Sequence, residues 1–172
     1  IGILFTGKSG VGKSEIALDL VERGHRLVAD DVVRIFRKSA GVLVGTSEEL
    51  LKSMLEIRGV GLIDVWSIFG IRAVRVQKRL EVVVHLEIAK NLEEYDRLGT
   101  ETKYKKFLDV EIPIIYLPIL PGKNITVISE VIALKAMQRV YGIQPEHDFM
   151  RRLDEKIKEN RHIRKYLTGD LE

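Results

Sequence analysis

The chain contains no cysteine among its 172 residues. This absence excludes disulfide bonds and thiolate metal sites and favours a reducing compartment, so we expect a cytoplasmic protein. Long hydrophobic runs are also missing. No apolar stretch approaches the roughly 18 residues of a membrane span, and the first residues lack the charged-then-apolar order of a signal peptide, so we expect no membrane partner. Because the sequence lacks an initiating methionine and opens inside a strand-like run, we expect a piece of a longer protein.

A strong excess of one charge is missing as well. The sequence has 28 lysines and arginines against 25 acidic residues, a formal net charge of +3. Proteins that bind nucleic acid cluster basic residues on one face, so this balance predicts no nucleic-acid partner. The length and the 45% hydrophobic content fit one globular domain with a buried core.

Helical and extended patterns are intermixed along the chain, which predicts an α/β fold with a mixed sheet flanked by helices. Residues 1–6 form an apolar run typical of a buried strand. Residues 14–23 carry apolar side chains at helical spacing, and Gly24 can end that helix. The segment "LEVVVHLE" at residues 80–87 is the clearest buried strand in the sequence.

The other segments complete the predicted organisation. A capping box, Thr46 followed by Glu49, predicts a helix ending at residue 56. Residues 91–108 are polar and are expected to form a mobile loop, while the prolines within residues 111–124 favour edge strands and turns. We expect a single catalytic domain over residues 1–172, with its core at about 1–142 and a helical segment at about 145–167.

A glycine-rich segment follows the first strand and matches the pattern G-x-x-x-x-G-K-[ST]. Its position between an apolar strand and an amphipathic helix is the context expected of a phosphate-binding loop, because glycines let backbone N–H groups wrap a phosphate. The lysine would bind the β and γ phosphates and the last serine would bind Mg²⁺. The candidate nucleotide-binding residues are Gly7, Lys8, Ser9, Gly10, Val11, Gly12, Lys13 and Ser14.

Two adjacent carboxylates, Asp30 and Asp31, follow apolar residues 27–29, which predict a buried strand. The carboxyl end of such a strand would face the ligand side of the sheet, beside the phosphate loop. Because neighbouring strand residues point to opposite faces, one carboxylate could face the substrate and the other the metal or the scaffold. His25 and His85 flank or lie within apolar strands, and we expect both to be core histidines with satisfied hydrogen bonds, and not ligands or bases.

A phosphate loop alone leaves three classes open: a switch GTPase, a kinase and an ATPase motor. Residues 96–99 spell D-x-x-G, as in GTPases, but no guanine-reading N-K-x-D segment follows. A motor needs a strand that ends in an acid for Mg²⁺, and Asp30, Asp31 or Glu87 would satisfy that need. The small size and the lack of a second sensor region count against a motor.

Four segments carry a family resemblance, in the order "FTGKSGVGKSEIALDLVERGHRLVADD", "LEIRGVGLIDV", "EYDRLG" and "VEIPIIYLPILPGKNITVI". Over roughly residues 1–157 the chain resembles the catalytic domain of HPr kinase/phosphorylase, a bacterial enzyme that acts on a serine of the phosphocarrier protein HPr. The L-E-I-R-G-x-G signature at residues 55–61 and the doubled aspartate after G-H-R-L-V-A are particular to that family.

The resemblance implies a phosphate-loop core similar to the nucleotide-binding core of phosphoenolpyruvate carboxykinase. It implies Mg²⁺-dependent phosphorylation of HPr by ATP or pyrophosphate, and reversal by inorganic phosphate with release of pyrophosphate. By position, Asp30 matches the catalytic aspartate, and Asp31 would help to orient the metal. Glu56 matches a metal-binding glutamate, Arg58 an arginine near the phosphates, and Arg97 an arginine that stabilises the transferring phosphoryl group.

The resemblance also implies a homohexamer, an N-terminal domain, and a histidine upstream of the first strand, the last two outside this chain. Many members carry a basic residue where this chain has Leu120, although Lys123 keeps a positive charge nearby. Two alternatives stay open at this point. One is a phosphate-loop kinase for another substrate, and the other is a non-catalytic module that senses nucleotide or phosphate.

Overall fold

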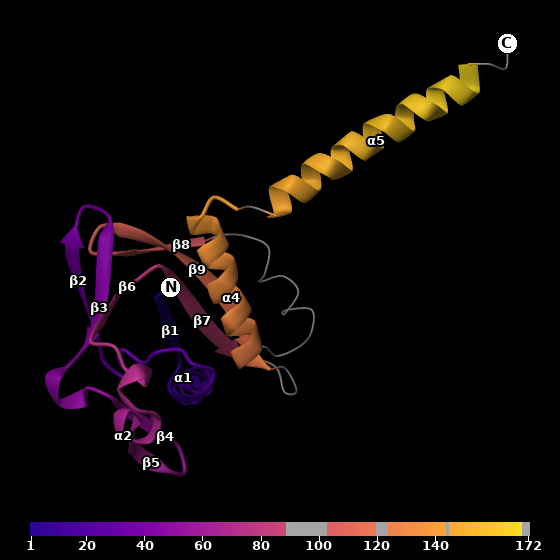
Figure 1. The fold of residues 1–172 in the computed structure, drawn as a ribbon. Coiled ribbons are helices and arrows are strands. Elements are labelled where there is room, and N and C mark those ends of the chain that lie inside the picture. Colours follow the sequence, from indigo (N-terminus) through magenta and orange to yellow (C-terminus); the bar gives the residue numbers. More distant parts are fainter. Residues whose placement is uncertain (89–102, 120–123, 144, 170–172) are drawn as a thin grey trace. The chain divides into compact units, whose positions relative to one another are not determined.

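The computed structural model describes residues 1–88, 103–119, 124–143 and 145–169. Its fold divides into two units, Ile1–Ala136 and Met137–Glu172. The first unit is built around a four-stranded sheet with helices against it (Figure 1). The predicted α/β class with a mixed sheet flanked by helices is therefore confirmed.

The main sheet has the strand order β1-β7-β9-β8. The first three strands are parallel, and β8 runs antiparallel to β9. The apolar run Val82–Val84 is almost completely buried, as expected for a parallel strand covered on both faces. The strands are β1 (Ile3–Gly7), β7 (Val82–Ile88), β8 (Lys103–Phe107) and β9 (Val110–Ile119). The carboxyl ends of the parallel strands meet at one edge, where the glycine-rich segment begins.

Two helices, α1 (Lys13–Glu22) and α4 (Ile125–Val140), pack against one face of this sheet. Their apolar residues join strand residues in a single core cluster, whose buried members include Ile16, Leu20, Val84, Leu86, Leu117 and Ile132. Helical spacing of Ile16 and Leu20 places both on the buried face of α1. The helix that follows the glycine-rich segment is thus anchored to the sheet along its length.

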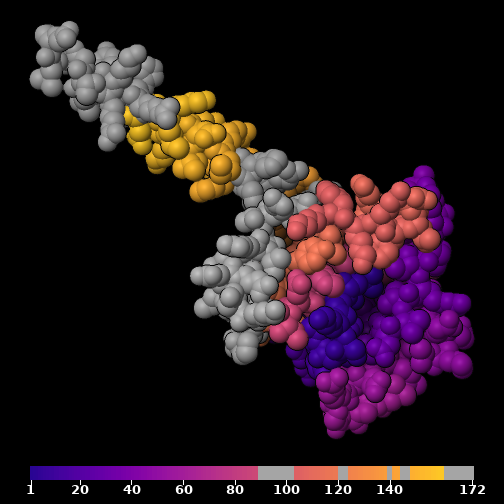
Figure 2. Space-filling view, turned by 180° about the vertical axis from the view of Figure 1, so that it is seen from behind, coloured from indigo at the N-terminus to yellow at the C-terminus, as the bar shows by residue number. Residues whose placement is uncertain are grey.

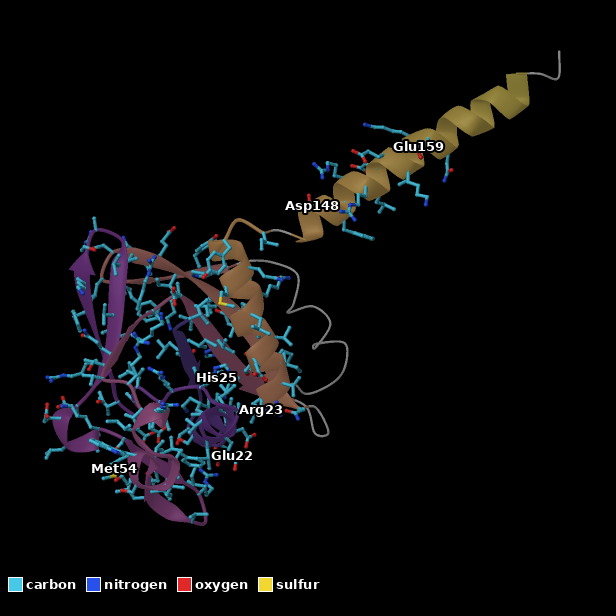
Figure 3. The ribbon with its side chains drawn as sticks, in the orientation of Figure 1. Glu22, Arg23, His25, Met54, Asp148 and Glu159 are labelled. Carbon is cyan, nitrogen blue, oxygen red and sulfur yellow. The ribbon has the colours of Figure 1, made fainter. Side chains whose placement is uncertain are left out.

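Polar contacts also connect α1 with α4. Thr126 donates a hydrogen bond to Asp19 at 2.6 Å. At the end of α1, Arg23 and His25 both pair with Glu130 of α4, at 3.4 and 3.2 Å; Figure 3 labels these two side chains beside α4. His25 is exposed at this position, so its predicted place in the core is wrong.

The opposite face of the main sheet is covered by a smaller antiparallel sheet with the order β2-β3-β6. Leu43 of this sheet packs in one cluster with Val83 and Ile114. The strands are β2 (Val33–Ser39), β3 (Val42–Ser47) and β6 (Gln77–Arg79). From the other side, Figure 2 displays the indigo N-terminal residues between the purple residues that follow them and the pink and orange later strands.

A hairpin and a short helix complete the first unit. The hairpin consists of β4 (Met54–Ile57) and β5 (Gly61–Asp64), and β5 leads into α2 (Val65–Phe69). Two short 3₁₀ segments, η1 (Glu49–Leu51) and η2 (Ile71–Ala73), flank these elements. Leu55 and Val65 are fully buried here against α1 residues such as Val21, which attaches the hairpin to the helix after the glycine-rich segment.

The second unit contains the end of α4 and the helix α5 (Pro145–Gly169), where the sequence predicts a helix. Gly142 has a φ of 75° directly after α4, the left-handed conformation that glycine adopts most readily at a helix end. No helix in the described part of the chain has the length and apolarity needed to cross a membrane.

The helix predicted to end at residue 56 is wrong. Thr46 lies in β3, Glu49 begins the 3₁₀ segment η1, and β4 starts at Met54. Leu55 is fully buried in the cluster beside α1, whereas Leu50 is 91% exposed. Pairing with β5 and burial of alternate residues outweigh the local helix signal here.

The prolines of residues 111–124 do not mark an edge strand, because β9 lies between β7 and β8. Pro113 and Pro118 nevertheless each pair with one neighbouring strand, Pro113 with β8 and Pro118 with β7. The ladder with β7 begins at Ile114, and the ladder with β8 ends at the same residue. Since proline has no N–H to donate, each ring lies where the other side of the strand has no ladder partner.

Two further expectations are only partly right. The predicted loop over residues 91–108 includes β8, which begins at Lys103, while residues 89–102 lie outside the described residues. The strand predicted at residues 27–29 is reduced to one bridge between Leu27 and Val74. Leu27 donates to Ala73 O and accepts from Arg75 N, both at 2.8 Å, so this stretch is held beside η2.

Candidate functional site

The glycine-rich loop, defined here as residues 7–14, connects the carboxyl end of β1 to the start of α1. Gly10 and Gly12 adopt positive φ values of 76° and 97°, and Gly12 is the N-cap of α1. Other residues rarely adopt this conformation, which explains the glycines at these positions. The Lys13 ammonium donates to the carbonyl oxygens of Gly7 at 3.3 Å and Lys8 at 3.0 Å. The loop therefore holds one positive charge beside the N-terminus of a helix, where an anion is favoured.

Asp30 is hydrogen-bonded to this loop. The Ser14 hydroxyl donates to its Oδ1 at 2.8 Å, and the backbone N–H of Glu56 donates to its Oδ2 at 3.0 Å. Both carboxylate oxygens are thus engaged, one by the start of α1 and the other by β4. The structure brings together three predicted site residues that lie far apart in the sequence.

Asp31 has different surroundings. Its side chain is exposed, and within the described part of the chain it has neither a hydrogen-bond partner nor an ion-pair partner. Asp30, Asp31 and Lys13 line one cavity of about 580 Å³ that runs beside β1. At this edge of the sheet, Asp30 is hydrogen-bonded to the glycine-rich loop, whereas Asp31 is exposed to the cavity.

Arg58 approaches the loop from the β4–β5 hairpin. A Cβ atom added to Gly10 would lie 2.6 Å from one guanidinium nitrogen of Arg58, so the guanidinium lies directly over this glycine. Glu56 lies in β4 and is exposed, while Arg58 begins the turn after the strand. The predicted extended stretch is therefore only partly right, because it ends one residue before Arg58, and both residues lie near the loop.

Three sequence-based candidates lie outside the described residues: Arg97, Leu120 and Lys123. Sequence reasoning also overlooked Thr6 at the end of β1, whose hydroxyl oxygen lies 2.9 Å from Nδ1 of His85. His85 is half-buried and has this polar partner, as expected of a core histidine whose hydrogen bonding is satisfied. The signal available in the sequence was a pair of polar residues near the ends of two apolar strands.

The carboxylates of this region fit a magnesium ion that is shared with a phosphate ligand. No group of three His, Asp or Glu side chains in the described residues could hold a metal ion by itself. Mg²⁺ is usually held by one or two carboxylates together with phosphate oxygens and water, and does not require a full protein cage. Ser14, Asp30 and Asp31 offer oxygen atoms of the right kind beside the positive end of α1.

Comparison with known proteins gives one consistent family. The model of the HPr Serine kinase C-terminal domain matches residues 1–153. A protein from Chloroherpeton thalassium named HPr kinase/phosphorylase is 53% identical over 157 residues, which cover 91% of this chain and 46% of that protein. A protein of the same name from Bacillus subtilis is 46% identical over 159 residues, which cover 92% of this chain and 51% of that protein. The chain thus spans about half the length of the curated relatives it matches.

A solved structure supports the same grouping. The Hpr(Ser) kinase/phosphatase from Coxiella burnetii aligns with a TM-score of 0.74 at 31% sequence identity. The alignment covers 87% of this chain and 90% of the aligned chain. The fold described above is therefore shared with that structure over most of both chains.

Proposed function

Since the chain belongs to the HPr Serine kinase C-terminal domain family, we propose that it is the catalytic part of a bifunctional enzyme acting on a serine of HPr. In one direction the serine oxygen attacks the terminal phosphorus of ATP or pyrophosphate, the bond from that phosphorus to the leaving ADP or phosphate breaks, and the serine proton passes to a carboxylate of the site. In the other, an oxygen of inorganic phosphate attacks phosphoserine, and pyrophosphate and the serine hydroxyl are released. The observation that carries the proposal is that Asp30, which accepts a hydrogen bond from Ser14 of the glycine-rich loop, lines one cavity together with Asp31 and Lys13.

The glycine-rich loop is the proposed phosphate-binding loop, in a core similar to that of phosphoenolpyruvate carboxykinase. Its backbone and the N-terminus of α1 favour an anion, and Lys13 supplies a compact positive charge. Lys13 now donates to Gly7 and Lys8, so a bound phosphate would compete with these two carbonyls for the ammonium. A bound Mg²⁺ would neutralise phosphate charge, with Ser14, Glu56 and the aspartates as its candidate ligands.

Proton transfer and metal binding are divided between the two aspartates. The sequence resemblance assigns proton transfer to Asp30 and metal orientation to Asp31. The hydrogen bonds favour the reverse, because both oxygens of Asp30 already accept from Ser14 and from Glu56 N. A general base must reach the proton that it removes, and Asp31 is exposed in the shared cavity. We therefore assign Asp31 to the serine proton and Asp30 to the loop and the metal.

Two arginines complete the proposed site. Arg58, which lies over Gly10, would bind phosphate oxygens beside the loop. Arg97, which is outside the described residues, keeps its proposed role of stabilising charge on the transferring phosphoryl group. The homohexamer, the cytoplasmic location and the single-domain organisation likewise remain proposals that rest on the family.

The proposal is tested by incubating the chain with γ-labelled ATP, Mg²⁺ and purified HPr. We expect label on a serine of HPr and, after addition of inorganic phosphate, its release as pyrophosphate. Nucleotide binding without label on HPr would contradict the proposal and favour a kinase for another substrate or a nucleotide-sensing module. Asp31→Asn should remove transfer and keep Mg²⁺-nucleotide affinity, whereas Asp30→Asn should weaken that affinity. The opposite result would restore the assignment implied by the sequence.

A further inference from the structure

A row of polar and aromatic side chains crosses three parallel strands of the main sheet and reaches β8. Thr6 and His85 are register partners on β1 and β7, and Tyr116 is the partner of His85 on β9. The His85 and Tyr116 rings meet edge to face, with centroids 5.3 Å apart, and the Lys103 ammonium lies 5.3 Å from the Tyr116 centroid. With the Thr6–His85 contact of 2.9 Å, the imidazole is contacted on both sides.

This row lies at the same edge as the glycine-rich loop. Thr6, His85 and Tyr116 are each half-buried, on the sheet face that also carries Leu4 and Val83. Thr6 also lines the cavity that contains Lys13 and the two aspartates. The imidazole is therefore one side chain away from the proposed phosphoryl-transfer site.

A short series of contacts leads from His85 to Lys13. Thr6 is followed directly by Gly7, and a Cβ atom on Gly7 would lie only 2.6 Å from Leu86 O, so β1 and β7 are closely packed where the loop begins. The Gly7 carbonyl oxygen accepts from the Lys13 ammonium. A displacement of Thr6 would move this carbonyl and with it the charge proposed to bind phosphate.

We propose that His85 is a positioning residue for phosphoryl transfer, which acts by holding Thr6 and the end of β1 in place. The inference rests on the proposed function, because it concerns the same phosphate-binding loop. His85 does not need to touch the substrate in this role. Tyr116 supports it by fixing the orientation of the imidazole ring, and Lys103 packs over Tyr116 on the far side.

The test compares steady-state transfer in four single variants. His85→Phe keeps a ring against Tyr116 but removes the hydrogen bond, and Thr6→Val removes the hydroxyl with little change in volume. We expect kcat to fall roughly two- to tenfold in each, the effect of losing one hydrogen bond, with a smaller change in KM for ATP. His85→Asn should restore kcat because its amide can reach the position of Nδ1. Thr46→Val, which removes another hydroxyl hydrogen bond in β3, should leave kcat unchanged.

The double variant Thr6→Val/His85→Phe should lose no more than either single variant, because both remove the same contact. Wild-type kcat in the two single variants would overturn the inference. So would a loss in His85→Phe that His85→Asn does not recover, since that outcome would assign the effect to packing.

A second measurement keeps this inference separate from the proposed function. In amide NMR spectra of the chain without nucleotide, His85→Phe and Thr6→Val should shift the signals of residues 7–13, and His85→Asn should not. If the wild-type chain transfers no phosphate to HPr, the proposed function fails, and these spectra alone decide the role of His85. Unchanged loop signals in both His85→Phe and Thr6→Val would overturn it.

Discussion

Asp30 and Asp64 have closely similar hydrogen-bond partners in two different regions of the first unit. Asp30 accepts from the Ser14 hydroxyl and from the backbone N–H of Glu56. Asp64 accepts from the hydroxyls of Ser53 and Ser67 and from the backbone N–H of Trp66. The same chemistry, a carboxylate bound by serine and a backbone amide, therefore occurs twice.

The surroundings separate the two carboxylates. Asp30 lies beside a lysine, a second carboxylate and a cavity at the carboxyl edge of the sheet. Asp64 is the N-cap of α2 and links β5 to the start of β4 through Ser53. An aspartate–serine hydrogen bond does not by itself mark a functional site. The neighbouring loop and charge give Asp30 its proposed role, whereas Asp64 stabilises a corner of the fold.

Among the residues of the glycine-rich loop, the largest effect is expected for Lys13→Met. Removing the ammonium should reduce phosphoryl transfer roughly 100-fold or more, as removal of one preorganised charge stabiliser commonly does. The melting temperature should change little, because the hydrogen bonds that Lys13 makes within the described residues are to two carbonyls of its own loop. Lys38→Met, at an exposed position of β2, is the matched control and should transfer phosphate at the wild-type rate. Equal rates in the two variants would remove Lys13 from the site.

In the second region, around Asp64, substitution should change the stability of the fold. Hydrogen bonds from Ser53, Ser67 and the backbone lower the pKa of Asp64 below its usual 3.8, so the folded state favours the ionised form. Its contribution is full above that value and is lost as the pH falls through the lowered pKa. Asp64→Ala should therefore lower the denaturation midpoint most at neutral pH.

The difference in denaturation midpoint between Asp64→Ala and the wild type should shrink as the pH falls below about 4. The transfer activity of Asp64→Ala at neutral pH should stay near that of the wild type. Urea titrations at several pH values measure the denaturation midpoint, and the assay with γ-labelled ATP measures the transfer activity. Asp148→Ala is the control. Asp148 pairs with Arg151 on an exposed surface of α5, so its loss should have little effect at any pH. A midpoint difference for Asp64→Ala that grows in acid would contradict the assignment.

A matched pair of glycine substitutions measures the contact of Arg58 with the loop. Gly10 and Gly24 both have positive φ, and a Cβ atom on either is strained by about 1 kcal/mol. On Gly10 that atom would also meet the Arg58 guanidinium, whereas on Gly24 it meets nothing within 4 Å. Gly10→Ala should therefore weaken nucleotide binding, and Gly24→Ala should only lower stability. Equal affinities in the two variants would show that Arg58 does not constrain the loop.

The smallest effect is expected for Glu130→Gln, which breaks the pairs with Arg23 and His25. These side chains are partly exposed, and such pairs contribute less than about 1 kcal/mol. A slight fall in melting temperature at low salt, and none at high salt, is the expected result. A large loss of transfer would mean that α4 controls the loop through α1.

The sequence predicted the parts of the site that depend on local pattern. The glycine spacing, the apolar strand before it and the amphipathic helix after it predict a strand, a turn and a helix, and the structure has β1, positive φ values at Gly10 and Gly12, and α1 in that order. The contact of Arg58 with Gly10 could not be predicted, because it depends on how the β4–β5 hairpin packs against α1. The strand β4 itself was mistaken for a helix for the same reason, since burial of Leu55 outweighed the capping signal at Thr46.

The difference in hydrogen bonding between Asp30 and Asp31 could not be predicted either. Sequence reasoning placed them on a strand with alternating side chains, but the structure forms only the Leu27–Val74 bridge there. Their difference arises from the tertiary partners Ser14 and Glu56, which are 16 and 26 residues away from Asp30. Local periodicity carries no information about such pairings.

The comparison between the two carboxylates is tested most directly by measuring transfer rate and melting temperature together for Asp30→Asn and Asp64→Asn. We predict that Asp30→Asn loses most transfer to HPr and keeps its melting temperature, whereas Asp64→Asn keeps transfer and melts at a lower temperature. If Asp30→Asn transfers phosphate at the wild-type rate, Asp30 is a structural residue like Asp64, and the central claim is contradicted.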